Sequence, residues 1–316
     1  MKVLALAGGV GGAKLAHGLA MTLQQGDELT VVVNTGDDFE HWGLFVSPDL
    51  DTVCYALAGL ENPQTGWGRA EESWHVLQEM RTLGAADWFA LGDRDLATHL
   101  ERSRRLRSGQ RLSEVTASFC SAWGIDCRVL PMSDDPAPTL VETVDAGVLP
   151  FQEYFVRLRC EPRVSGFDLS AARQAAPAVG VLQAIQEADV VIVCPSNPWV
   201  SIGPILAVPG ILPALQMHGC VAAVSPLIGG VAVKGPAAKM FRELGFEPGV
   251  MAVAECYRDF LKAMIIDFRD EKYATSLTQW GIIPYITDTY MSDKNQRRRL
   301  ASQILEFCQL LLKGGL

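Results

Sequence analysis

The sequence predicts a doubly wound α/β fold built on a mostly parallel, Rossmann-like sheet. Five short apolar runs end abruptly in Gly, Pro, Ser, Asn or Asp, as strands buried on both faces of a parallel sheet do. The segments between the runs are long enough for the helical crossovers that parallel strands need. The runs are VLALAGG, LTVVVNTGDD, CRVLPMSDD, DVVIVCPSNP and CVAAVSPLIGG, from residues 3, 29, 127, 189 and 220.

The connection between the second and third predicted strands is much longer than the others, and it predicts an inserted helical cap at approximately 52–123. Three stretches there, ESWHVLQEMRTLG, DLATHLERSRRLRSG and RLSEVTASFCSAWG, repeat apolar residues at helical spacing and end at Gly84, Gly109 and Gly124. In residues 139–160 apolar and polar residues alternate, which predicts a β-hairpin that turns at 145–147. The C-terminal portion is expected to be mostly helical. Without an internal repeat or a linker, we expect one domain over 1–316.

Composition excludes several classes of protein. A formal net charge of -9 argues against a broad basic surface for nucleic acid. The basic runs RSRRLRSGQR and KNQRRR are typical of solvated helix faces. No stretch reaches the roughly 20 apolar residues of a membrane helix, and the N-terminus lacks a secretory pattern, so we expect a cytoplasmic protein with no membrane partner. The eight cysteines lack metal-ligand spacing and are expected in the core.

A glycine-rich turn follows the first predicted strand directly and leads into a helical pattern. It contains Gly8, Gly9, Gly11, Gly12 and Lys14. Glycines let a backbone approach a diphosphate closely, and a helix N-terminus offers free N–H donors and a favourable dipole. The spacing departs from both the dinucleotide fingerprint and the phosphate loop, so a plain strand-to-helix turn is the alternative.

A carboxylate-rich loop follows the second predicted strand. Five acids fall within fifteen residues without a Lys or Arg among them: Asp37, Asp38, Glu40, Asp49 and Asp51. Mg²⁺, Lys14 or solvent could offset their repulsion, and Mg²⁺ usually takes one or two carboxylates together with substrate phosphates. For Asp38 and Glu40 the default is a solvated surface.

Other loops at predicted strand ends carry polar side chains. In LGDRDLATH, Asp93 or Asp95 is expected to cap a helix, and Arg94 is placed to bind a ligand. The loops PMSDDP and CPSNPWVSIGP offer hydroxyls, amides and carboxylates, although the same residues are common in turns, and Lys234 is a further possible anion contact. The histidines show no ligand spacing and no nucleophile motif is present, which favours binding and in-line transfer between phosphates.

Taken together, six segments resemble the 2-phospho-L-lactate transferase family. The match runs from residue 3 to about residue 267 and resumes at ITDTYM, residues 286–291. The segments are GGVGGAK, VVVNTGDDFEHWGLFVSPDLDT, LGDRDLATH, LPMSDDP, PSNPWVSIGPI and VSPLIGGVAVKGPAAK.

The resemblance implies a definite reaction. A phospholactyl or phosphoenolpyruvyl group passes from a guanosine-diphosphate-activated donor to the ribityl hydroxyl of 7,8-didemethyl-8-hydroxy-5-deazariboflavin, and GMP is released. The step belongs to coenzyme F-420 biosynthesis and requires Mg²⁺. The resemblance also favours a homodimer.

The resemblance also implies roles for particular residues. Asp51 and Arg94 match positions that contact the deazaflavin, where Asp51 would orient the attacking hydroxyl or take its proton. Asp37 and Asp49 are the metal candidates. The residues assigned to the donor nucleotide and its diphosphate are Gly9, Gly11, Gly12, Lys14, Ser196, Asn197, Ser201 and Gly203.

Two other functions compete with this one. A non-catalytic, nucleotide-sugar-binding regulatory protein of the same fold would bind guanine or uridine nucleotides and no deazaflavin. A dinucleotide-dependent oxidoreductase is disfavoured by the imperfect glycine fingerprint and by Asn34, which stands where a ribose-binding acid would end the second strand.

Overall fold

A seven-stranded parallel sheet forms the centre of the computed structural model, which describes residues 1–314. The strand order β14-β13-β10-β9-β1-β2-β5 confirms the predicted fold class. All five predicted strands are present. The strands are β1 (Lys2–Ala7), β2 (Glu28–Val33), β5 (Arg128–Pro131), β9 (Val190–Val193), β10 (Val221–Val224), β13 (Ala263–Asp267) and β14 (Ile283–Thr287).

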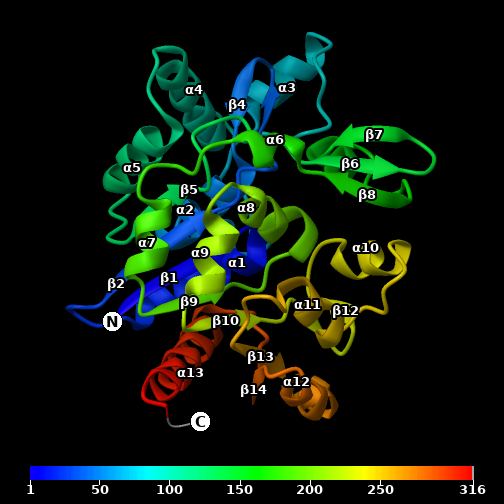
Figure 1. Cartoon of the computed structure of the whole chain (residues 1–316). Helices are drawn as coiled ribbons and strands as arrows, with labels where there is room; N and C mark the ends of the chain where they lie inside the picture. Colours follow the sequence, from blue (N-terminus) through cyan, green and yellow to red (C-terminus); the bar gives the residue numbers. More distant parts are fainter. Residues whose placement is uncertain (315–316) are drawn as a thin grey trace.

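Helices cover both faces of the sheet, so alternate side chains of one strand enter different cores (Figure 1). In β1, Val3 and Ala5 pack towards α1, α2 and α13, whereas Leu4 and Leu6 pack towards α7, α9 and α11. Burial on both faces explains why the strands read as unbroken apolar runs. These helices are α1 (Gly9–Thr22), α2 (Pro48–Leu57), α7 (Val181–Glu187), α9 (Ile211–Met217), α11 (Val250–Tyr257) and α13 (Lys294–Leu312).

The strand order reverses between β1 and β9. From β1 the chain proceeds outward through β2 and β5, and from β9 it proceeds the other way through β10, β13 and β14. The loops after β1 and β9 therefore diverge and leave a crevice at the carboxyl ends of the strands, where open α/β sheets bind ligands. The glycine turn and the loop 194–203 both lie there.

The long connection between β2 and β5 contains the predicted helices. Gly84, Gly109 and Gly124 follow three of them with φ of 80°, 91° and 67°, the left-handed region that favours glycine after a helix. α2 was not among the predicted helices, and it packs on α1. The elements are hairpin β3 (Phe39–His41) with β4 (Leu44–Val46), α3 (His75–Thr82), α4 (Asp93–Arg107) and α5 (Leu112–Ala122).

A second, antiparallel sheet forms an arm that projects from the main sheet, at the right of the view (Figure 1). β6 (Leu140–Thr143) and β7 (Gly147–Pro150) form the predicted hairpin, and β8 (Val164–Asp168) pairs with β6. The hairpin is shorter than expected, because a π-helical turn occupies Glu153–Arg157. Smaller elements complete the fold: α6 (Ser170–Gln174), α8 (Gly203–Ala207), β11 (Leu227–Ile228), β12 (Val231–Ala232), α10 (Ala237–Glu243) and α12 (Ala274–Gln279).

The expectation of a mostly helical C-terminal portion was wrong in one respect. β13 and β14 are strands of the main sheet, paired in parallel from Ala263 with Ile283 to Asp267 with Thr287. β13 is buried along its whole length, and its run AMII is as long and as apolar as those of β9 and β10, so it carried the signal of a buried strand. β14 lies at the edge and is partly exposed, and it lacks such a run.

The cysteine prediction is confirmed, since all eight are free and five of them are buried. Within residues 1–314 no single helix has the length and apolar character to cross a membrane, although the bent pair Pro198–Ala207 and Ile211–Met217 meets that test by length and composition. Four apolar residues of this pair lie in the core with α7 and α11: Ile202, Ile205, Ile211 and Leu215.

Candidate active site

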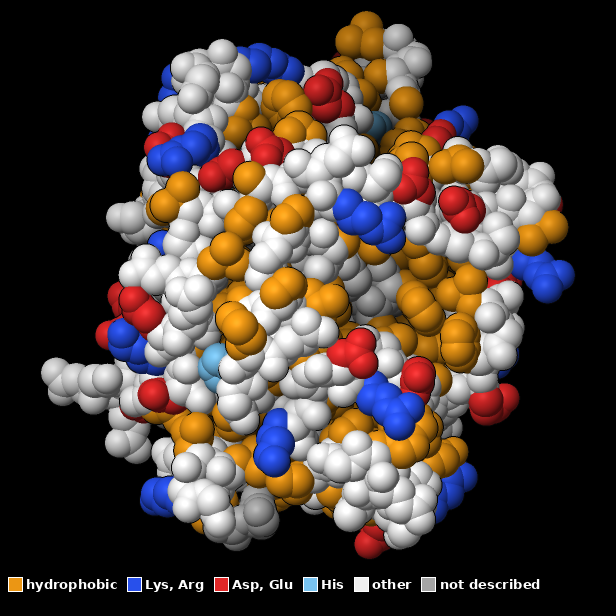
Figure 2. Space-filling view, in the orientation of Figure 1, with side chains coloured by type: hydrophobic (Ala, Val, Ile, Leu, Met, Phe, Trp, Pro, Cys, Tyr) orange, Lys and Arg blue, Asp and Glu red, His pale blue; other side chains and the backbone are white. Residues whose placement is uncertain are grey.

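A cleft of about 580 Å³ opens at the point where the strand order reverses. Its walls come from the turn after β1, the loops after β2 and β9, the start of α4, the π-helical turn after β7 and the loop around β12. Hydrophobic side chains gather beside the hollow between the β6–β8 arm and the α10–β12 region (Figure 2). The loops after β1, β2, β9 and β10 thus meet at this cleft, whereas no residue of the loop after β5 lines it.

The glycine turn forms the N-terminus of α1 at the wall of the cleft. Gly9 has φ of 62°, in the left-handed region, and its N–H donates to Asp49 Oδ1 at 2.6 Å. A Cβ on Gly11 would lie 2.2 Å from the carbonyl oxygen of Pro195, so the two loops touch only because this residue is glycine. The N–H groups of Val10 and Gly11 begin the helix, where no intrahelical acceptor exists, and they are available to an anion.

The loop after β9 supports this turn from the other side. The Ser196 hydroxyl accepts from Gly8 N–H at 3.1 Å and donates to Gly8 O at 2.8 Å. A Cβ on Gly12 would lie 2.6 Å from that hydroxyl, so Gly12 permits the packing and does not line the cleft. Ser201 lines the cleft beside Gly8.

Asn197 and Gly203 have structural contacts in the same loop. Asn197 lines the cleft, but its Oδ1 accepts from Trp199 N–H and caps the π-helical turn Pro198–Ile202. Gly203 begins α8 and lies outside the cleft lining, with the carbonyl oxygen of Pro198 3.0 Å from the place of a Cβ.

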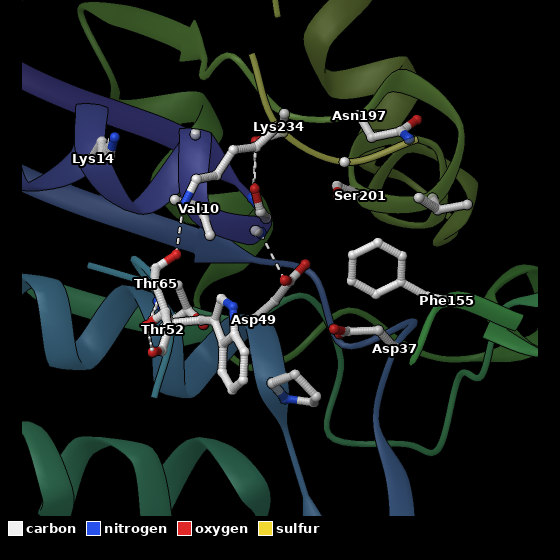
Figure 3. A pocket seen from close by; sticks show the side chains of 18 of the residues that line it. Val10, Lys14, Asp37, Asp49, Thr52, Thr65, Phe155, Asn197, Ser201 and Lys234 are labelled. Carbon is white, nitrogen blue, oxygen red and sulfur yellow. Dashed lines mark hydrogen bonds between the residues drawn. The ribbon is translucent and has the colours of Figure 1, made fainter. Parts of the chain in front are cut away.

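Two lysines line the cleft, and each contacts a main-chain carbonyl. Lys14 Nζ donates to Met291 O at 2.7 Å, and Lys234 Nζ reaches across to Thr65 O (Figure 3). Within residues 1–314 neither has a carboxylate partner. Burial, with the nearby charges of Arg297 and Lys234, lowers the pKa of Lys14. Both positive charges therefore remain available to an anionic ligand.

Asp37 and Asp49 lie close together at the same end of the cleft (Figure 3). Asn34 Nδ2 contacts both, at 3.4 Å from Asp37 Oδ1 and 2.9 Å from Asp49 Oδ2. Gln152 donates to the other oxygen of Asp37 at 3.1 Å. Each carboxylate oxygen can accept more than one bond, so this pair retains free ligand positions.

Burial raises the pKa of both acids. The pKa of Asp49 is raised to about 6, against hydrogen bonds from Asn34 and Gly9 that favour the anion. For Asp37 burial and repulsion by Asp49 raise the pKa well above its usual range. Two buried, mutually repelling carboxylates fit a cation, and two is the number that Mg²⁺ commonly takes when phosphates supply further ligands. The predicted metal candidates are thus brought together.

The solvated surface expected for Asp38 was wrong. One oxygen of Asp38 accepts from the Ser47 hydroxyl at 2.7 Å, and the other is buried without a partner. Burial raises its pKa well above the usual range. Glu40, in contrast, is exposed as expected.

Asp51 lines the cleft two residues after Asp49 on α2 and forms a buried ion pair with Arg102. The part of the cleft around this ion pair is called the Asp51 end. Arg102 Nη1 donates to Asp51 Oδ2 at 3.0 Å, and Nη2 donates to Oδ1. Only 3% of the Arg102 side chain is exposed. The expectation that RSRRLRSGQR is a solvated face was therefore wrong for Arg102, although Arg104 and Arg107 of the same run are exposed.

Asp95, His99 and Tyr55 extend this ion pair into a network that lines the cleft. Arg102 Nη1 lies 3.1 Å from His99 Nδ1, and the Tyr55 hydroxyl donates to Asp95 Oδ1 at 2.7 Å. Burial raises the pKa of Asp95, but its contacts with His99 and Tyr55 outweigh burial and lower the pKa overall. Ligand atoms of Asp51, Asp95 and His99 lie within 4.8 Å of one another. Arg102 already neutralises Asp51. A divalent cation therefore fits the pair Asp37 and Asp49 better.

Arg94 is not among the residues that line the cleft. It is half exposed and forms a surface ion pair with Glu71 at 3.1 Å. The repulsion among the acids is therefore relieved by Arg102, not by Arg94. The expected capping of α4 by Asp93 or Asp95 was also wrong. Glu72 accepts from the N–H groups of Arg94 and Asp95, and Asp93 caps α3 by accepting from His75 and Val76.

The other basic run, KNQRRR, also contains a buried residue. Arg297 donates to Glu61 Oε1 at 2.6 Å and lies 3.0 Å from His17 Nδ1. Burial and the charge of Arg297 lower the pKa of His17 to about 4. Glu61 begins a loop, residues 61–69, whose tip carries Thr65, so this ion pair ties α13 to the loop that Lys234 contacts.

Sequence reasoning missed His99 and Arg102, although a signal was present. Asp95, His99 and Arg102 are spaced four and three residues apart, which places them on one face of a helix. Asn34 and Gln152 were missed because amides in loops carry no pattern of their own.

Comparison with known proteins places the chain among transferases of small phosphorylated acids. The family model described as 2-phospho-L-lactate transferase CofD matches residues 3–305. A protein named phosphoenolpyruvate transferase from Kitasatospora aureofaciens is 42% identical over 321 residues, covering 100% of both chains. A protein named 2-phospho-L-lactate transferase from Methanosarcina acetivorans is 40% identical over 303 residues, covering 96% of this chain and 98% of its own.

Solved structures show the same fold at much lower identity. A crystal structure of a UPF0052 family member from Bacillus halodurans superposes with a TM-score of 0.64 at 16% identity, covering 96% of this chain and 99% of the other. At this identity the likeness concerns the fold alone.

Proposed function

Since the chain belongs to the 2-phospho-L-lactate transferase family and is a transferase of that family, we propose that it carries out a specific transfer. A phospholactyl or phosphoenolpyruvyl group moves from a guanosine-diphosphate-activated donor to the ribityl hydroxyl of 7,8-didemethyl-8-hydroxy-5-deazariboflavin. GMP is released, and the product is an intermediate of coenzyme F-420 biosynthesis. We also expect a cytoplasmic homodimer.

One observation carries the proposal: the charged groups that line the cleft form two sets with different partners. The end formed by α1 has two lysines without carboxylate partners, free helix N–H groups and the buried pair Asp37 and Asp49. These groups suit a diphosphate, which needs both N–H donors and positive charge. The donor nucleotide is therefore assigned to this end, beside Ser196, Asn197 and Ser201.

Mg²⁺ is proposed at Asp37 and Asp49. When bound, it would neutralise charge on the phosphoryl oxygens of the donor. The support is the raised pKa of both acids: burial, and for Asp37 also repulsion by Asp49, now favours protonation, and a bound cation would offset these effects. Asn34 would hold the two carboxylates in place through its contacts with both.

The acceptor is assigned to the end with Asp51. Arg102 holds Asp51 as an anion with both oxygens fixed, which suits a group that orients a hydroxyl and accepts its proton during attack on phosphorus. Positioning and electrostatic stabilisation then provide most of the catalysis. Arg94 is proposed as a peripheral contact that exchanges Glu71 for the acceptor.

The direct test is mass spectrometry of the products. The enzyme is incubated with Mg²⁺, the deazaflavin and each activated donor in turn, and we expect one phosphodiester product and GMP. Chelation should stop the reaction and added Mg²⁺ should restore it. Nucleotide binding without product from any donor would overturn the proposal and favour the regulatory alternative.

A further inference from the structure

One polar atom at the Asp51 end of the cleft is buried without a partner. It is Nε2 of His99, a cleft-lining residue that is 1% exposed. A buried polar atom without a hydrogen-bond partner in the protein is expected to bind a ligand or water, because its desolvation is otherwise uncompensated.

The protonation of His99 follows from its other nitrogen. Nδ1 lies 3.1 Å from Nη1 of Arg102, and a guanidinium nitrogen is always a donor. Nδ1 must accept, since a protonated ring would set two N–H groups against each other. The neutral ring therefore carries its proton on Nε2, which makes Nε2 a hydrogen-bond donor and excludes it as a metal ligand.

Two carboxylates surround this donor. Nε2 is 3.5 Å from Asp95 Oδ1, beyond good hydrogen-bond distance, and that oxygen already accepts from Tyr55. Asp51 lies on the other side of the ring, with Oδ2 3.7 Å from Nδ1. One N–H donor and two acceptors thus converge on one part of the cleft.

This combination selects the chemistry of its ligand. A hydroxyl can accept from Nε2–H while it donates to a carboxylate, whereas a carbonyl could satisfy only the donor and an anion would be repelled by both acids. A chain of hydroxyls can fill such a site better than a single group.

We propose that His99 is an acceptor-binding residue whose Nε2–H donates to one hydroxyl of the acceptor's ribityl chain, while Asp51 or Asp95 accepts from that chain. The inference rests on the proposed function, which supplies the polyol. Arg102 is a positioning residue, because it fixes both the anion of Asp51 and the proton of His99.

Two substitutions separate the donor from the structural contact. In His99→Asn the amide oxygen takes the place of Nδ1, so the contact with Arg102 remains and Nε2–H is lost. In His99→Gln the amide nitrogen takes the place of Nε2, so an N–H donor remains. We expect the Kd of the deazaflavin, measured by calorimetry, to rise on the order of tenfold in His99→Asn and to recover largely in His99→Gln.

Acceptor analogues identify the hydroxyl. The wild type and His99→Asn are each titrated with deazaflavins that lack one ribityl hydroxyl. Removal of the contacted hydroxyl should weaken binding to the wild type and have little further effect on the variant, because the two changes delete the same bond. The exposed His75 lies outside the cleft lining, and His75→Asn is the matched control.

The outcomes distinguish this inference from the proposed function. If the wild type binds no deazaflavin, the proposed function fails. If the wild type binds and both His99 variants bind equally well, or are weakened equally, the donor role of Nε2 is overturned and the function stands. Equal losses in wild type and His99→Asn for every deoxygenated acceptor would also overturn it.

Discussion

The two ends of the cleft balance their charges in different ways. At the Asp51 end, Arg102, His99 and Tyr55 pair with the acids, and the network is nearly complete within the protein. At the α1 end, two lysines contact only carbonyls, and two carboxylates contact only neutral donors. One end is preorganised, and the other is completed by its ligands.

This difference suits the two substrates proposed for the cleft. A neutral polyol brings no charge, so the acids that orient it must be neutralised by the protein itself. A nucleoside diphosphate with its cation brings charges of both signs, so the protein must leave complementary charges unpaired. The following predictions test this contrast, from the largest expected effect to the smallest.

Asp51→Asn should reduce the rate of transfer on the order of 10²- to 10⁴-fold, because an amide cannot accept the hydroxyl proton. Initial rates at saturating donor and acceptor measure the effect, and circular dichroism checks the fold. The amide oxygen can still accept from Arg102, so the fold should persist. Turnover close to that of the wild type would remove Asp51 from the chemistry.

Arg102→Met should lower the free energy of unfolding by about 3–5 kcal/mol, because it leaves the buried Asp51 charge unpaired. Urea denaturation measures this change. Asp51→Asn combined with Arg102→Met should recover part of the loss, since the unpaired charge is then absent. Arg104→Met is the control, because Arg104 pairs with Glu101 on the surface and should have little effect.

The pH dependence of stability should reveal the Asp37 and Asp49 pair. The folded protein binds a proton at Asp49 more tightly than the unfolded chain, because its pKa rises from 3.8 to about 6. The stability that protonated Asp49 contributes is therefore fully present below about pH 4. It is lost as the pH rises through 6, and the loss is about 3 kcal/mol.

Melting temperatures in chelator and in Mg²⁺ measure this dependence. Mg²⁺ should raise the melting temperature above about pH 6 and have little effect below pH 4, where protons occupy the pair. Asp49→Asn should lose the part of the decline with pH that Asp49 contributes and most of the response to Mg²⁺, whereas the buried Asp37 still contributes a decline of its own. A wild-type response to Mg²⁺ that is the same at both pH values would place the cation elsewhere.

Lys234→Met should weaken the binding of GDP, used as a probe of the donor end, by about tenfold, and Lys14→Met should do the same. The loss should shrink at high ionic strength, because salt screens an accessible charge. Binding of the deazaflavin should not change. Lys272→Met is the control, since Lys272 is exposed and lies outside the cleft lining. An equal loss for both ligands would contradict the division of the cleft.

Arg94→Ala should have the smallest effect, a rise of about threefold or less in the KM of the deazaflavin with an unchanged kcat. Arg94 is half exposed and its partner Glu71 is exposed, and such surface ion pairs contribute little. A large fall in kcat would show that Arg94 enters the cleft with the substrate.

The sequence pointed to the α1 end of the cleft more clearly than to the Asp51 end. A glycine turn after a strand and a run of acids after the next strand are local patterns, and the parallel sheet brings both to one edge. Arg102 depends instead on tertiary burial. In a run of arginines the buried member resembles its exposed neighbours, and only its spacing from His99 and Asp95 marks it.

The strands and helix caps show the same limit. β1, β2 and β9 were predictable because both faces are buried, which requires a continuous apolar run. β14 lies at the edge and mixes exposed and buried positions. Asp93 was assigned to the helix that follows it in the chain, but its carboxylate caps α3 through a contact across space.

The two tethers from the end of the chain have a consequence for synthesis. Lys14 contacts the carbonyl of Met291, and loop 61–69 is held through Glu61 by Arg297 of α13. Translation makes these anchors last, so the N-terminal half of the sheet can begin to fold while the donor end of the cleft is still open. A nascent or prematurely terminated chain that lacks α13 would therefore lack the tether on loop 61–69, and we expect it to hold the proposed donor nucleotide less firmly.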